Sequence, residues 1–156
     1  MPEVLQLAIE CGLDQNACRK IKTHFDGYTS EGLGGLKVRC TVGDMGPDEL
    51  GIWWVGIVAT TDEHIFQGSD DSKLLVNVAK IFYERLKSVK GFRFAVVGIE
   101  CYQFNNAEAL QRLLNHPALK GLVISDELFR SFNEPEGFNY FAPGYRQRPL
   151  LEGPIL

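Results

Sequence analysis

The sequence predicts one domain of the α+β type, close to α/β, built on a mixed and mainly parallel β-sheet of about four strands with helices on both faces. Three segments of strand length, residues 51–59, 94–99 and 121–124, are apolar along both of their faces. Strands of this kind are covered on both sides. Helical segments separate them, and right-handed crossovers would make the three strands parallel.

A fourth strand is expected over residues 36–42, where apolar and polar side chains alternate from Leu36 onward. This alternation is typical of a strand with one solvent-exposed face, near the edge of a sheet. A turn that contains Gly-Pro-Asp then leads into residues 51–59. We therefore expect 36–42 to lie antiparallel beside 51–59.

The N-terminal residues 1–26 predict a helical hairpin. A short helix over residues 2–11 ends at Gly12, because glycine commonly follows the last helical turn. Asp14 is the expected N-cap of a second helix, which ends near Phe25. This hairpin would cover one face of the sheet.

Three more helices are expected within residues 36–132, the part of the chain that holds the sheet. A long amphipathic helix follows Ser69 and covers residues 70–88. Another helix ends before Pro117, and a short last helix follows Ser125.

Residues 133–156 differ in composition from the rest of the chain and predict an extended C-terminal arm. Four of the seven prolines lie here, together with the aromatic side chains of Phe138, Tyr140, Phe141 and Tyr145. The sequence leaves two interpretations open. The arm either packs on its own domain or docks on a partner or a second copy of the chain, as in a homo-oligomer.

Composition and charge argue against several classes of function. The net charge of −4 and the pI near 5.4 disfavour non-specific binding to nucleic acid, which needs a basic patch. The longest uncharged apolar run, residues 51–59, is about half the roughly 20 residues of a membrane span. Four scattered cysteines without a signal-peptide pattern predict reduced thiols in a cytoplasmic protein. No motif for a nucleotide or another cofactor is found in the sequence.

The acidic residues are unevenly distributed. Between Cys40 and Ser72 the chain carries seven acids and no Lys or Arg, namely Asp44, Asp48, Glu49, Asp62, Glu63, Asp70 and Asp71. The negative electrostatic field of these acids would speed the encounter with a basic partner and would favour positively charged partners over negatively charged ones. The sequence therefore predicts a non-enzymatic, acidic protein-binding module. A more specific hypothesis is an inhibitor or immunity-type protein that binds a basic partner. The alternative is that these acids lie in solvated loops and helix starts.

A second set of polar residues follows the three predicted parallel strands, whose carboxyl ends would meet at one edge of the sheet. These residues are Asp62, Glu63 and His64, then Glu100 and Cys101, then Asp126. The carboxylates of Asp62, Glu63, Glu100 and Asp126 would suit a divalent metal such as Mg²⁺. His64, Cys101 and Glu100 are candidate catalytic residues, because a neighbouring imidazole lowers the pKa of a thiol and activates it as a nucleophile.

This second set predicts the alternative function, a small metal-dependent or thiol-dependent enzyme such as a hydrolase. A structural explanation competes with it, because Asp126 follows a Ser N-cap and acids are favoured in the first turn by the helix dipole. The sequence contains no Walker, nucleophile-elbow or zinc-protease motif that would decide between the two functions.

Overall fold

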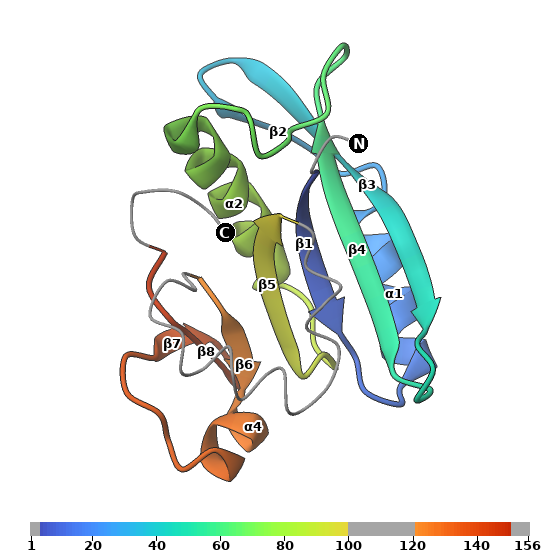
Figure 1. Cartoon of the computed structure of the whole chain (residues 1–156), viewed down its shortest axis with the longest axis vertical. Coiled ribbons are helices and arrows are strands. Elements are labelled where there is room, and N and C mark those ends of the chain that lie inside the picture. The colour runs from blue at the N-terminus through green and yellow to red at the C-terminus, as the bar shows by residue number, and fades with distance from the viewer. Residues whose placement is uncertain (1–3, 100–120, 151–156) are drawn as a thin grey trace.

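The computed structural model describes residues 4–99 and 121–150. In this part of the chain eight strands form one sheet in the order β2-β3-β4-β1-β5-β6-β8-β7, and every neighbouring pair is antiparallel (Figure 1). The strands are β1 (Leu5–Glu10), β2 (Thr29–Leu33), β3 (Leu36–Pro47), β4 (Trp53–Thr60), β5 (Phe94–Ile99), β6 (Val123–Ser125), β7 (Asn139–Ala142) and β8 (Tyr145–Gln147). The helices of this part are α1 (Gln15–Phe25), α2 (Ser72–Leu86) and α4 (Asp126–Ser131).

The centre of the sheet has the topology of a split β-α-β unit. β1 pairs with both β4 and β5, so these two strands run in the same direction with β1 between them. α1 connects β1 to β2, and α2 connects β4 to β5. The arrangement of β3, β4, β1 and β5 with two helical crossovers is that of the ferredoxin-like βαββαβ motif. β2 extends this unit at one edge, and β6, β8 and β7 extend it at the other.

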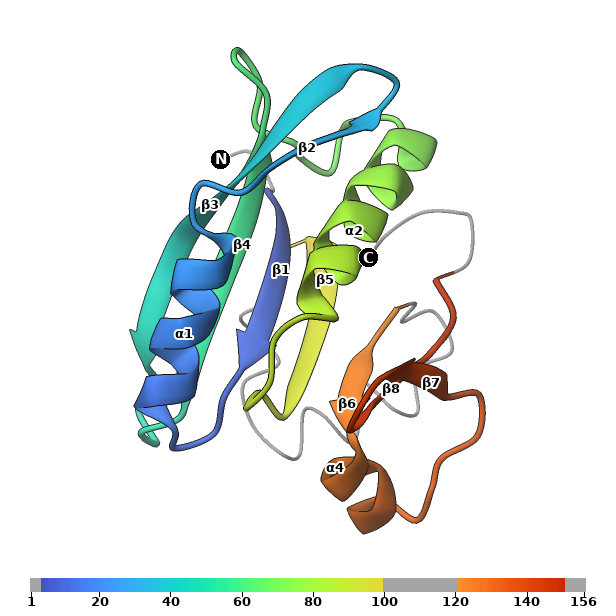
Figure 2. The same cartoon turned by 180° about the vertical axis from the view of Figure 1, so that it is seen from behind.

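Helices lie on both faces of the sheet. α1 and α2 pack side by side on one face, as Figure 2 shows, and bury a core with the inward side chains of Leu7, Ile57 and Val97. Because alternate residues of a strand point to opposite faces, Phe94 and Val96 lie on the other face. There they pack with Phe129 of α4 in a second, smaller core.

Several elements form where the sequence predicts them. Asp14 is the N-cap of α1 and its Oδ1 accepts from the Ala17 amide at 3.0 Å, while Ser125 is the N-cap of α4. β3 pairs antiparallel with β4, as expected for residues 36–42 and 51–59. α2 begins slightly later than predicted, because Asp71 rather than Ser69 is its N-cap. The predicted helix before Pro117 lies outside the described residues. Among the described helices, none is long and apolar enough to cross a membrane.

The prediction of a mainly parallel sheet of about four strands is wrong. β1 separates β4 from β5, and β6, from the segment predicted as the third parallel strand, runs antiparallel to β5. The crossover rule describes strands that are already parallel and in one sheet. A helical segment between two strands does not by itself make them parallel neighbours, because another strand can lie between them, as β1 does here.

The predicted N-terminal helical hairpin is also wrong, because its first half is the strand β1. Leu5, Leu7 and Ile9 point into the helix-covered core, although the spacing of Leu5, Ala8 and Ile9 also fits a helix. All six residues of β1 are buried, including Gln6 and Glu10. A pattern that assigns polar side chains to solvent cannot identify a strand that buries them.

The expectation of an extended C-terminal arm is corrected for residues 139–147. They form the β7–β8 hairpin, which joins the sheet where β8 pairs with β6. The Tyr145 hydroxyl donates to the Phe92 carbonyl at 2.8 Å and accepts from the Gly91 amide at 3.1 Å, and its ring stacks on Phe92. This part of the arm therefore packs on its own chain.

Candidate functional site

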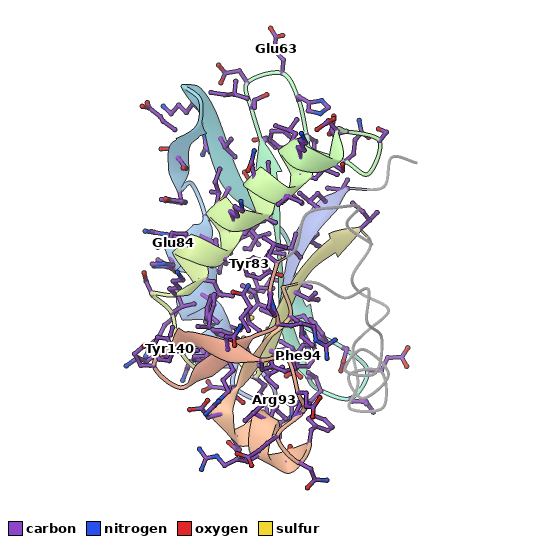
Figure 3. The ribbon with its side chains drawn as sticks, turned by 90° about the vertical axis from the view of Figure 1, so that its left-hand side faces the viewer. Glu63, Tyr83, Glu84, Arg93, Phe94 and Tyr140 are labelled. Carbon is purple, nitrogen blue, oxygen red and sulfur yellow. The ribbon has the colours of Figure 1, made fainter. Side chains whose placement is uncertain are left out.

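Most of the predicted acidic residues lie in the connection between β4 and α2, residues 61–71. The connection starts as a tight turn, in which the Thr61 amide donates to the His64 carbonyl at 2.8 Å. Asp62 and Glu63 form the tip of this turn, and Figure 3 shows Glu63 at the outer end of the molecule. Phe66 is buried behind the tip, and its carbonyl accepts from the Leu5 amide at 3.0 Å. The turn is thus fastened to the centre of the sheet.

His64 and Asp70 form an ion pair that closes this connection. The His64 Nε2 lies 2.8 Å from Asp70 Oδ2, which also accepts from the Gln67 amide at 2.8 Å. Burial tends to raise the pKa of Asp70, but the hydrogen bonds from Gln67 and His64 outweigh it and hold the pKa below its ordinary value. The imidazole also packs edge-on against Phe66. A carboxylate that orients an imidazole is an arrangement found in general-base sites.

Two of the other predicted acids have roles in the local backbone structure, and for a third the structure gives only its place in a strand. Asp71 accepts from the Lys73 and Leu74 amides at 3.0 and 3.3 Å as the N-cap of α2. Asp48 accepts from the Leu50 and Ile52 amides at 2.9 and 3.0 Å and so closes the β3–β4 turn. Asp44 is placed in β3 opposite Gly56.

The remaining three acids are exposed. Within the described ranges Glu49, Asp62 and Glu63 have neither an ion pair nor a side-chain hydrogen bond. Of these, Asp62 and Glu63 are adjacent and share one turn, which the hydrogen bond from Thr61 to His64 closes. Of the seven acids, they are the adjacent pair whose carboxylates are left for binding a partner within the described residues.

The predicted metal and catalytic residues are only partly brought together. β4 and β5 end at the same end of the sheet, but Glu100 and Cys101, which follow β5, lie outside the described residues. Asp126 follows β6, which runs the opposite way, so it lies at the other end of the sheet and pairs with Arg146 at 3.3 Å. Over residues 4–99 and 121–150 no three His, Cys, Asp or Glu side chains are grouped closely enough to hold a metal ion.

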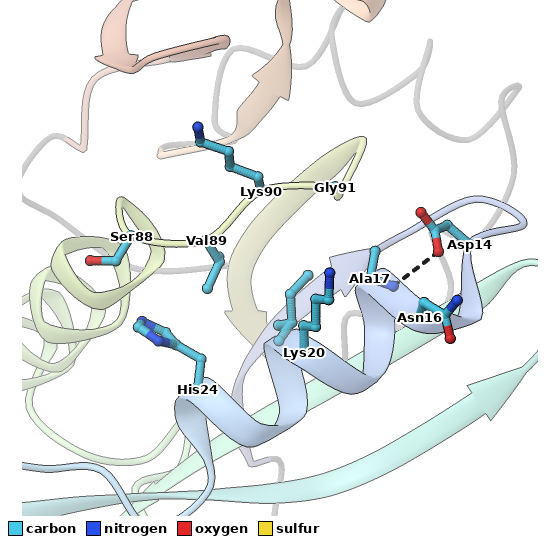
Figure 4. Close-up of a pocket in the computed structure, with 10 residues that line it drawn as sticks. Asp14, Asn16, Ala17, Lys20, His24, Ser88, Val89, Lys90 and Gly91 are labelled. Carbon is cyan, nitrogen blue, oxygen red and sulfur yellow. Dashed lines mark hydrogen bonds between the residues drawn. The ribbon is translucent and has the colours of Figure 1, made fainter.

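A groove that the sequence does not predict lies between α1 and the connection from α2 to β5. It encloses about 480 Å³. Figure 4 shows Lys20 and His24 on the wall formed by α1, with Ser88, Val89 and Lys90 on the opposite wall. Lys20 and His24 are one helical turn apart, which is a visible signal in the sequence. The second wall comes from residues about 70 positions further along the chain, and only the fold brings it there.

The groove has fixed walls. The His24 Nε2 donates to the Arg85 carbonyl at 3.1 Å, and the Arg85 Nη2 donates to the His24 carbonyl at 2.8 Å. Burial lowers the pKa of His24, and the nearby positive charge of Arg85 lowers it further. The hydrogen bond from the imidazole to the Arg85 carbonyl acts in the opposite direction but does not outweigh them. At the other end Gly91 has φ +89°, and a Cβ there would lie 2.7 Å from the Ala17 Cβ. The connection therefore touches α1 directly.

The cysteines in the described ranges do not provide a nucleophile. Cys11, Cys18 and Cys40 are free and buried. Burial raises the pKa of all three thiols, and that of Cys40 reaches about 12. Since the thiolate is the reactive form, these side chains act as small apolar residues of the core.

Comparison of the chain with protein-family models, curated proteins and solved structures finds no match. Its function is therefore inferred from its own fold and surface.

Proposed function

We propose that this chain is a protein-binding module that docks a basic partner through the tip of the β4–α2 connection. The observation that supports this proposal is the position of Asp62 and Glu63, two adjacent, exposed carboxylates without a partner in the described residues, on a turn that is fastened to the core. A rigid binding loop loses little conformational entropy when it docks. Its negative field steers a positively charged surface toward it.

The acidic segment of the sequence is divided between the two ends of the sheet. Asp48 and Glu49 precede β4, whereas Asp62 and Glu63 follow it. The eight residues of β4 span about 26 Å, and exposed charges at that distance are screened from each other at physiological salt. A compact basic partner would therefore contact one end. We assign the contact to Asp62 and Glu63, because Asp48 is already used by the β3–β4 turn.

The test is a quantitative binding measurement on matched charge variants. Proteins captured from an extract of the producing cells by the wild type, and lost on the Asp62→Asn/Glu63→Gln variant, are purified and titrated. We expect Kd to rise about tenfold or more in that variant, and the wild-type Kd to rise with salt. Glu134→Gln/Glu136→Gln removes the same charge from two exposed positions after α4 and is the control. Equal binding by all three proteins, or equal weakening in both variants, would contradict the proposed docking site.

The His64–Asp70 pair favours a second candidate function, an enzyme that uses a thiol. In this case His64 would activate Cys101, whereas the other three thiols are buried. We expect iodoacetamide to modify Cys101 in the folded protein faster at pH 7 than an ordinary thiol, and His64→Ala to slow this reaction about tenfold. A rate that does not change in His64→Ala would remove this candidate.

The metal-dependent form of the enzyme has a separate test. A ligand that binds only the folded state raises the midpoint of thermal unfolding. We would measure this midpoint with Mg²⁺, Mn²⁺, Ca²⁺ and Zn²⁺, using Asp62→Asn and Glu100→Gln as variants. A shift that both variants lose would support a metal site, and the absence of any shift would dismiss it.

A further inference from the structure

The charge of the protein is unevenly divided among its elements. Residues 14–26 and 71–90, which comprise α1, α2 and the residues that flank them, carry eight Lys or Arg side chains against four Asp or Glu. This part has a formal charge of +4, although the whole chain has −4. The two helices lie side by side on one face of the sheet (Figure 2). The net charge, which by itself disfavours nucleic acid, therefore conceals a basic face.

The four acids of this part of the chain are engaged locally. Asp14 and Asp71 accept backbone amides as the N-caps of α1 and α2. The Asp26 Oδ1 accepts from the Val42 amide at 3.4 Å. Glu84 pairs with Lys87 at 3.0 Å. By contrast, five exposed basic side chains of α1 and α2 have no ion-pair partner within the described residues, namely Arg19, Lys20, Lys22, Lys73 and Lys80.

The exposed polar side chains of α1 form one row. Asn16, Arg19, Lys20 and Thr23 are exposed, and their spacing of three or four residues places them on the same side of the helix. On α2, Lys80 is exposed near the middle of the helix. The buried residues of both helices belong to the larger core. The row and Lys80 therefore point away from the sheet, into solvent.

This face suits a polyanion better than a membrane. A helix that binds a membrane inserts its apolar side into the lipid, but the apolar sides of α1 and α2 are buried in the core. Of the large hydrophobic side chains that are exposed in the described residues, none is on either helix. Single-stranded nucleic acid is usually held by stacking its bases on aromatic rings, and the exposed Tyr140 is on β7. A duplex, whose phosphates are exposed and whose bases are already stacked, needs neither feature.

From these observations we propose that the helical face binds duplex DNA, with α1 toward the major groove and Lys80 on a neighbouring phosphate. The duplex carries one negative charge per roughly 1.7 Å of its axis, so it matches a face with several basic side chains. The major groove of B-DNA admits an α-helix, whereas that of an RNA duplex is too deep and narrow. Arg19 and Lys20 can donate to phosphates or to base edges in that groove.

The test is a titration of the protein against a short, fluorescently labelled DNA duplex, followed by anisotropy. We expect saturable binding whose Kd rises about tenfold or more between about 50 and 200 mM salt, since each neutralised phosphate releases counterions. An RNA duplex of the same sequence, the single DNA strand and phosphatidylserine vesicles should each bind at least about fivefold more weakly. Equal or tighter binding of any of these three would overturn the assignment to duplex DNA, and so would the absence of saturable DNA binding.

Matched charge variants decide whether the helical face is responsible. Arg19→Gln/Lys20→Gln should raise the Kd for the duplex about tenfold or more. The control, Lys37→Gln/Arg39→Gln, removes the same charge from exposed positions of β3. These alternate with the buried residues 38 and 40 and so lie on the opposite face of the sheet. The control should leave the Kd within about twofold, and equal loss in both variants would contradict the proposed face.

A third variant separates this proposal from that of the acidic turn. Asp62→Asn/Glu63→Gln should bind the duplex at least as tightly as the wild type, because it removes negative charge that repels DNA. Weaker DNA binding by this variant would count against the helical face. The two proposals can therefore fail independently, since one predicts a loss on changing these acids and the other does not.

Discussion

Glu10 carries a carboxylate into the interior of the sheet, where only 1% of the residue is exposed. Two nitrogens of Arg93 donate to this carboxylate, Nε at 2.8 Å and Nη2 at 2.5 Å, and the Gly12 amide donates to it as well. The two residues lie 83 positions apart in the sequence. Removing one member of a buried ion pair is costly, because the remaining charge is left without compensation.

We expect Arg93→Ala to lower the free energy of unfolding by about 2 kcal/mol. Loss of a partner in a fully buried pair costs about 3 to 5 kcal/mol, but the Arg93 side chain is 44% exposed and solvent screens part of the interaction. Urea unfolding measures this difference. Arg130→Ala, which removes an exposed guanidinium on α4, should stay within about 0.5 kcal/mol of the wild type. Similar values for the two variants would contradict the role given to Arg93.

Asp70 makes the stability of the β4–α2 connection depend on pH. Its pKa in the folded protein lies below the ordinary value of 3.8, because the hydrogen bonds from Gln67 and His64 outweigh the opposing effect of burial. A carboxyl group with a lowered pKa stabilises the folded state above its unfolded-state pKa. That stabilisation is lost as the pH falls through the folded-state pKa.

We therefore expect Asp70→Asn to be less stable than the wild type by about 1 kcal/mol at pH 5, with a difference that shrinks toward pH 3. Urea unfolding at several pH values gives the comparison. Asp62→Asn, whose side chain has no partner in the described residues, should show no such trend. A difference that is constant or grows toward low pH would be inconsistent with the lowered pKa.

At the level of elements, the contact between α1 and the α2–β5 connection depends on a glycine. Gly91 adopts φ +89°, which disfavours any residue with a Cβ. A Cβ at this position would also lie 2.7 Å from the Ala17 Cβ, well inside van der Waals contact. The connection can cross α1 here, and form a wall of the groove, because residue 91 has no side chain.

We expect Gly91→Ala to lower the free energy of unfolding by about 2 kcal/mol, since backbone strain of this kind costs about 1 to 3 kcal/mol and the clash adds to it. Ala17→Gly alone should cost about 1 kcal/mol through its lower helix propensity. The double variant should lose less than the sum, because the clash is then absent and only the strain at residue 91 remains. Strict additivity in a double-mutant cycle would show that the two residues do not touch.

At the level of the whole molecule, local signals in the sequence predict local structure and fail where the chain buries polar groups or pairs distant segments. The cap residues Asp14 and Ser125 correctly mark α1 and α4, because capping is a contact within one turn. β1 is missed because Glu10 is buried only by pairing with Arg93. These two residues lie far apart in the sequence, and a periodic pattern of apolar residues gives no information about such a contact. The direction of β6 is missed because it follows from pairing with β5 and β8.

The same limits apply to the candidate sites. The acidic turn is visible in the sequence, because Asp62 and Glu63 are neighbours between two predicted elements. The sequence does not show that Asp48, Asp70 and Asp71 are engaged in turns, a cap and an ion pair. The groove needs two segments that only the packed helices bring together. Neither segment alone therefore predicts the groove.

The two cores of the sheet should unfold together, because β1, β4 and β5 each contribute side chains to both. Trp53 packs against the larger core and Trp54 against the smaller one, so tryptophan fluorescence reports on both. Tyr145→Phe should lower the free energy of unfolding by about 1 to 2 kcal/mol, since the buried Phe92 carbonyl and the Gly91 amide lose their partner. If the chain is one cooperative domain, urea midpoints from far-UV circular dichroism and from fluorescence fall by the same amount. A separate early transition in the variant would instead show that the β6–β8–β7 edge unfolds as a unit of its own, and would refute the single-domain prediction.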